Sequence, residues 1–96
     1  MSDSKKLFDN YILLGNPVTL ELASEQQLRV LLGCLRVYKS RYEEQLRKLG
    51  MIEDSLLLNK AISYKILSTQ PTGEITVELF TSVIQPKTSL SFKIIQ

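Results

Sequence analysis

The spacing of apolar residues between Ser24 and Gly50 predicts one long amphipathic helix. An α-helix turns by about 100° per residue, so side chains three and four positions apart share a face. The apolar stripe along this segment consists of Leu28, Leu31, Leu32, Leu35, Tyr38, Tyr42, Leu46 and Leu49. Ser24 is a suitable N-cap, Gln27 completes a capping box, and Gly50 can adopt the left-handed conformation that ends a helix. The stripe must be buried, so this helix is expected to cover the core.

A second, narrower apolar seam lies on another side of the same helix. It consists of Val30, Gly33, Cys34 and Val37, at the spacing i, i+3, i+4 and i+7. Glycine inside a helix costs about 1 kcal/mol relative to alanine, so Gly33 indicates that another element packs close to the backbone. That element is either the chain's own short N-terminal helix or a second copy of the long helix. A short chain has few elements to spare, which favours a homodimer.

Alternation of apolar and polar residues predicts strands on both sides of the helix. The expected strands are 18–22, 57–68, 74–84 and 89–95. The last three are expected to form a meander, with the long helix on one face of the sheet and the other, polar face open. Residues 5–14 have helical spacing and are expected to form a short leading helix, with a strand over 11–14 as the alternative.

Together these elements define a single α+β domain spanning residues 1–96. The expected order is α-β-α-β-β-β, with one long helix packed on a four-stranded, mainly antiparallel sheet. The sequence contains no internal repeat, low-complexity segment or linker. A chain of 96 residues can bury only a modest core, near the size at which oligomerisation contributes to stability.

The residue types present argue against an enzyme. The sequence has no histidine, which removes the commonest general base and metal ligand. No serine lies in a Gly-x-Ser-x-Gly elbow, and no glycine-rich phosphate loop is present. We therefore expect no catalytic activity, no metal site and no cofactor. A single cysteine, Cys34, fits a reducing compartment, and the apolar runs are far shorter than a membrane span, so the sequence predicts a cytoplasmic protein.

The open sheet face offers a candidate surface for a protein partner. Phe80 is expected there between two lysines, Lys65 and Lys93. An exposed aromatic flanked by cations is a small contact patch of the kind found at interfaces. Sheets that stack nucleic-acid bases usually present two or three aromatics, so a single phenylalanine favours protein over nucleic acid at this face.

The long helix offers a second candidate surface, suited to phosphate groups. Arg29, Arg36 and Arg47 lie within about 20° of one another around the helix and could follow a nucleic-acid backbone. Glu43 and Glu44 fall on the flanks of this basic face, and an ordinary solvated face is the more common interpretation of such a pattern. The net charge of +2 neither demands nor excludes a nucleic-acid partner.

In size and layout the chain resembles small accessory proteins encoded by bacteriophages. The similarity covers the whole chain: a short helix ending in Leu-Leu-Gly-Asn-Pro-Val, a strand, a helix beginning Ser-Glu-Gln-Gln-Leu-Arg, and a meander. It implies a protein that binds a host or phage macromolecule in the host cytoplasm and blocks or adapts it. We therefore expect a non-enzymatic homodimer that acts by stoichiometric binding to another protein, with inhibition as one outcome. Nucleic-acid binding and a structural role in a larger assembly are the alternatives.

Overall fold

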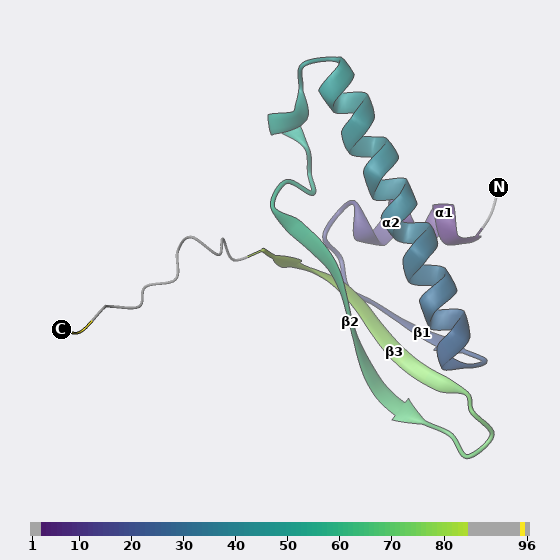
Figure 1. Cartoon of the computed structure of the whole chain (residues 1–96). Helices are drawn as coiled ribbons and strands as arrows, with labels where there is room; N and C mark the ends of the chain where they lie inside the picture. The colour runs from purple at the N-terminus through teal and green to yellow at the C-terminus, as the bar shows by residue number, and fades with distance from the viewer. Residues whose placement is uncertain (1–2, 85–94, 96) are drawn as a thin grey trace.

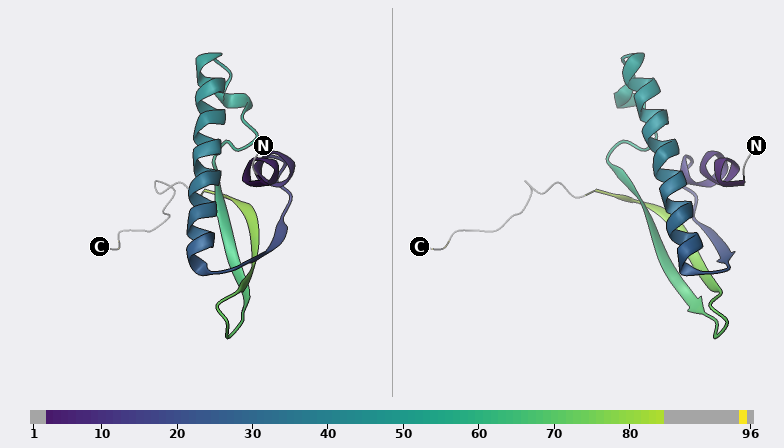
Figure 2. Two further views of the ribbon diagram at one scale, coloured as in Figure 1. Left: turned by 90° about the vertical axis from the view of Figure 1, so that its right-hand side faces the viewer. Right: turned by 45° about the vertical axis from the view of Figure 1, so that its right-hand side comes forward.

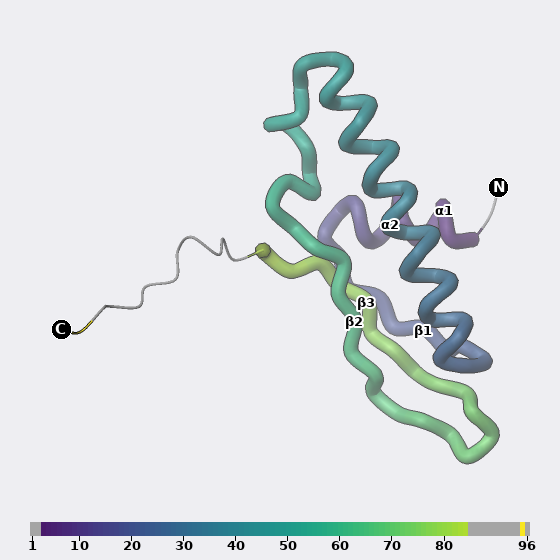
Figure 3. The backbone as a smooth tube through the Cα atoms, in the orientation of Figure 1, coloured from purple at the N-terminus to yellow at the C-terminus, as the bar shows by residue number. Residues whose placement is uncertain are grey.

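A computed structural model of the chain describes residues 3–84 and residue 95. The elements run in the order α1 (Asp3–Leu7), the π-helical turn η1 (Phe8–Ile12), β1 (Val18–Leu22), α2 (Glu25–Lys48), the 3-10 turn η2 (Ile52–Asp54), β2 (Lys60–Thr69) and β3 (Ile75–Val83). Figure 1 shows this path as a ribbon and Figure 3 as a tube. The leading segment is helical, so the alternative of a strand over residues 11–14 is wrong.

The described strands form one antiparallel sheet with the order β1-β3-β2. The central strand β3 pairs on one side with β1, where Val18 lies opposite Leu79, and on the other with β2, where Tyr64 lies opposite the same residue. The register between β2 and β3 shifts between Ile66 and Ser68, which leaves Leu67 as a bulge. β1 and β2 are therefore the two edges of the described sheet.

This topology contradicts the predicted four-stranded sheet beneath a single long helix. The described residues form three strands, and a second helical segment, α1 with η1, shares the helical layer with α2. In the expected meander the fourth strand would lie beside β3, yet β1 already pairs with β3 over residues 75–79. Alternation reports which face of a strand is buried but not which strand lies next to it. The predicted strand 89–95 falls outside the described residues except for Ile95, whereas the α+β class is confirmed.

Both helical segments lie on the same side of the sheet (Figures 1 and 2). The core between the two layers consists of Leu7, Phe8, Ile12, Leu28, Leu32, Leu35, Leu57, Ile75, Val77 and Leu79. Buried residues of β3 alternate with half-buried ones on the outer face, as the period of two in a strand requires. The predicted apolar stripe of α2 is buried at Leu28, Leu32 and Leu35, but Leu49 at its C-terminal end is 70% exposed, so the expectation of burial along the whole stripe is wrong there. The outer sheet face is uncovered by any described element.

The C-terminus of α2 ends in a Schellman motif at the predicted residue. Gly50 has a φ of 69°, in the left-handed region that favours glycine. Its amide donates to the carbonyl of Arg47 at 3.1 Å, and the amide of Met51 donates to the carbonyl of Leu46 at 2.7 Å. These two bonds satisfy carbonyls that the last turn of a helix otherwise leaves unpaired.

The N-terminus of α2 is held by a side-chain cap. The amide of Gln27 donates to Ser24 Oγ at 3.2 Å, and the amide of Ala23 donates to Gln27 Oε1 at 2.9 Å. The return bond of the capping box thus reaches the residue before the cap. Two backbone donors at the start of the helix are satisfied by these side chains.

Replacing Ser24 with alanine is expected to lower the free energy of unfolding by about 1 kcal/mol, because the amide of Gln27 loses its acceptor. Ser24→Asp retains an acceptor oxygen at the same place and is the matched control. Urea denaturation followed by far-ultraviolet circular dichroism measures both. Equal unfolding midpoints for wild type and Ser24→Ala would show that this cap contributes nothing to stability.

Candidate interaction surfaces

The seam of small residues predicted on α2 faces away from the core. Val30 is 62% exposed and Val37 is 46% exposed, while Cys34 is a half-buried free thiol. A Cβ added at Gly33 would meet no heavy atom within 4 Å outside its own helix backbone. The interpretation in which the N-terminal helix covers this seam is therefore wrong, because α1 and η1 pack elsewhere. The apolar seam is uncovered by the described part of the chain.

The seam continues along α2 into a shallow groove. Tyr38 and Arg41 extend it, and together with the seam residues they line a depression of about 490 Å³. The same two side chains also line a second groove on the neighbouring side of the helix. Tyr38 and Arg41 therefore connect the two surfaces.

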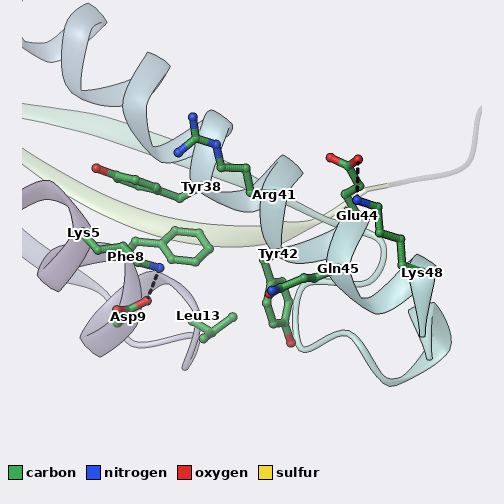
Figure 4. Close-up of a pocket in the computed structure, with 10 residues that line it drawn as sticks. All are labelled: Lys5, Phe8, Asp9, Leu13, Tyr38, Arg41, Tyr42, Glu44, Gln45 and Lys48. Carbon is green, nitrogen blue, oxygen red and sulfur yellow. Dashed lines mark hydrogen bonds and ion pairs between the residues drawn. The ribbon is translucent and has the colours of Figure 1, made fainter. Parts of the chain in front are cut away.

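The second groove lies between the N-terminal helical segment and the C-terminal half of α2 (Figure 4). It has a volume of about 400 Å³, and aromatic rings of Phe8, Tyr38 and Tyr42 contribute to its wall. The ring centroids of Phe8 and Tyr38 lie 5.8 Å apart with the planes tilted by 51°, a favourable arrangement for an aromatic pair. Lys5 Nζ lies 5.4 Å from each of these two centroids. The contacts of the Lys5 ammonium and the Phe8 ring with the Tyr38 ring thus join the two helical segments.

The polar groups of this groove are largely paired with one another. Lys5 Nζ lies 3.0 Å from Asp9 Oδ1, and Lys48 Nζ lies 3.6 Å from Glu44 Oε1. The hydroxyls of Ser4 and Tyr38 are 3.2 Å apart. Both ion pairs lie within one segment, whereas the contact between Ser4 and Tyr38 joins the N-terminal segment to α2.

Two further features were sought among the described residues, a cluster of metal ligands and a membrane-spanning helix. No group of three or more cysteine, aspartate and glutamate side chains lies together there in a way that could hold a metal ion. The described helices include none that is both long and apolar enough to cross a membrane.

The predicted basic face of α2 is exposed along its whole length. Arg29, Arg36 and Arg47 are all exposed, and none of them takes part in an ion pair among the described residues. The nearest acids on the helix are engaged elsewhere: Glu43 lies 3.9 Å from Lys39, and Glu44 pairs with Lys48. The three guanidinium groups are available to an anionic partner.

The outer sheet face carries part of the predicted partner-binding patch. Lys65 is exposed and lies opposite Glu78, and Phe80 is half-buried opposite Ser63. The third predicted residue, Lys93, lies outside the described residues. The described portion of the patch is therefore one aromatic side chain and one lysine on a mostly polar face.

Sequence reasoning did not find the groove around Lys5 or the exposure of one edge of the sheet. Both depend on contacts between segments far apart in the chain, and no local pattern reports such contacts. Comparison with known proteins adds no further guide: no family model, characterised protein or solved structure matches the chain.

Proposed function

We propose that this protein is a non-enzymatic interaction protein that forms a homodimer through the α2 seam and acts by stoichiometric binding to another protein. The observation that supports the dimer is the exposed apolar seam. A surface helix usually presents polar residues opposite its buried stripe. α2 instead exposes Val30 and Val37 there, on either side of a glycine whose Cβ position is open.

Pairing two copies of the seam buries these side chains without displacing any described element. Each valine transferred from water contributes about 1–2 kcal/mol, and Gly33 allows the two backbones to approach closely. The charge of Arg41 favours an antiparallel pair. In a parallel pair the two copies of Arg41 would lie together, whereas in an antiparallel pair centred between Gly33 and Cys34 each lies opposite Gln26 of the other copy.

We propose that the dimer acts in the cytoplasm. The chain has a single cysteine and so cannot form a disulfide within itself, which fits a reducing compartment such as the cytoplasm. The resemblance of the sequence in size and layout to bacteriophage accessory proteins would make this the host cytoplasm and the partner a host or phage protein. The proposal needs neither a cofactor nor a catalytic group.

Cross-linking at Cys34 tests the seam directly. A short bismaleimide is expected to join two chains into a covalent dimer, because an interface centred on Gly33 and Cys34 brings the two thiols together. The control is Cys34→Ser combined with Thr19→Cys, which moves the thiol to an exposed position on the outer sheet face. Efficient cross-linking of the control with none at Cys34 would place the interface elsewhere and refute the seam.

The unpaired arginines of α2 support nucleic-acid binding as a second candidate function. Reversing Arg29, Arg36 and Arg47 to glutamate is expected to abolish binding to duplex or single-stranded nucleic acid at low salt, measured by fluorescence anisotropy. Reversal of three lysines on other surfaces, Lys6, Lys60 and Lys65, is the control with the same change in charge. A wild-type chain that binds neither nucleic acid at low salt removes this candidate.

A further inference from the structure

The outer edge of β2 is the longest unpaired strand edge in the described structure. β2 spans Lys60–Thr69 and pairs with β3 on one side, and no described strand pairs with its other side. Alternate residues of such an edge direct their amide and carbonyl groups outward, where they can bond to another strand. The opposite edge, β1, spans only Val18–Leu22 and follows Pro17 directly.

Apolar side chains flank this open backbone. Tyr64 is 47% exposed and Ile66 is 38% exposed, although both lie opposite buried residues of β3 on the helical side of the sheet. They remain exposed because the described helices do not cover this part of the edge strand. Leu67, at the bulge, is 49% exposed. A strand added here would find both hydrogen-bonding groups and apolar contacts.

The charges of β2 determine which strand fits. The strand carries Lys60 and Lys65 and no acidic residue. A second copy of β2 would bring lysines toward lysines, and edge lysines together with a bulge are the features by which proteins oppose self-pairing of an edge. The chain's own residues 85–96 contain two further lysines and no acid, so they offer no complementary charge. An acidic strand from a different protein fits best.

We infer that the free edge of β2 binds an extended, acidic segment of the partner protein as an added strand. The inference rests on the proposed function of protein binding, and it specifies the partner's recognition element. Main-chain hydrogen bonds would provide the affinity, and side chains of alternating character would provide the selectivity. Apolar residues of the incoming strand face Tyr64 and Ile66, and acidic residues face Lys65.

A synthetic peptide of about eight residues that alternates valine and glutamate is the probe, a length set by the typical strand. The peptide carries a fluorophore, and its fluorescence anisotropy is expected to rise when the full-length protein is added. The binding curve is expected to saturate at one peptide per chain. Two control peptides separate the contribution of main-chain hydrogen bonds from that of charge. N-methylation of alternate amides removes the main-chain donors, and lysine in place of glutamate reverses the charge. Both controls are expected to bind weakly or not at all.

Charge-reversal variants of the protein test the same electrostatic contribution to peptide binding. Lys65→Glu is expected to weaken binding of the valine–glutamate peptide by about fivefold, because the loss of one surface ion pair is joined by repulsion between the new carboxylate and the glutamates of the peptide. Lys6→Glu changes the net charge equally on another surface and should leave the affinity within about twofold. Equal effects of the two variants, or full binding of the N-methylated peptide, would overturn the inference.

Hydrogen exchange of the full chain distinguishes a vacant edge from an occupied one. The outward amides of β2 are expected to exchange rapidly in the free protein and to be protected when the peptide is present. Protection before the peptide is added would mean that a second copy or residues 85–96 already occupy the edge, and this would overturn the inference. The seam dimer is measured separately by mass, so failure at the edge with an intact dimer leaves the oligomer proposal standing.

Discussion

Replacing Phe8 with alanine is expected to lower the free energy of unfolding by about 3–5 kcal/mol, the range for removal of a buried aromatic side chain. Phe8 is 1% exposed, and its ring packs against that of Tyr38 with Lys5 Nζ nearby. It is the point at which the N-terminal helical segment enters the core. Loss of the ring removes buried apolar surface, leaves a cavity and eliminates the contact between the Lys5 ammonium and the ring.

Urea denaturation measures this loss, with two companion variants. Tyr11→Ala removes an aromatic side chain that is 41% exposed on the same segment, and its effect is expected to stay below about 1 kcal/mol. Phe8→Leu keeps most of the apolar volume and should retain a measurable transition even if Phe8→Ala is largely unfolded. If Phe8→Ala cost no more than Tyr11→Ala, the N-terminal segment would lie outside the cooperatively folded unit.

Replacing Gly33 with leucine is expected to convert the dimer into a monomer. Four additional carbons at the centre of the seam would hold the two helix backbones apart and open a gap between Val30 and Val37 of facing copies. The monomer itself should not be harmed, because a Cβ at Gly33 meets nothing in its own chain. Leucine is a better helix former than glycine by about 0.8 kcal/mol, so the monomer is expected to gain stability.

This combination of lost association and raised helix stability separates an interface effect from misfolding. Arg47→Leu is the matched control, since it adds the same side chain to the exposed surface of the same helix about four turns away. The control is expected to remain dimeric. Retention of the wild-type mass by Gly33→Leu would show that the seam is not the contact surface.

The long helix was predictable because its signals are local. Ser24, the apolar stripe and Gly50 together specify where α2 begins, which side is buried and where it ends. The structure places the cap and the Schellman motif at these positions, and it buries the stripe at Leu28, Leu32 and Leu35 but not at Leu49. Such patterns depend on neighbours within a few residues along the chain. They therefore hold without any knowledge of the remaining fold.

The sheet was predictable in its faces but not in its topology. Alternation correctly assigns Ile75, Val77 and Leu79 to the core side of β3. Nothing in that pattern shows that β1 pairs with β3 and so occupies the position expected for the fourth strand. The order of strands is decided by how the helices and connections pack, which is a property of the whole chain.

Some of the candidate surfaces follow from local sequence patterns, and others depend on contacts between distant segments of the chain. The seam around Gly33 and the basic face around Arg36 follow from helical spacing, and the structure leaves both exposed. The groove at Lys5 and Phe8 and the open edge of β2 could not be predicted from such spacing. The groove forms where two distant segments pack together, and the edge is open because no described segment packs against it. The helical spacing also does not show which element covers the seam. That a second copy of the chain covers it remains our proposal.

Light scattering coupled to size-exclusion chromatography, at several protein concentrations and at two salt concentrations, tests the dimer most directly. The proposal predicts one peak with twice the chain mass of 11.0 kDa, little dependence on salt and no excess absorbance from nucleic acid. Since the sequence has no tryptophan, bound nucleic acid would dominate the absorbance spectrum. A mass of a single chain at every concentration would contradict the proposal.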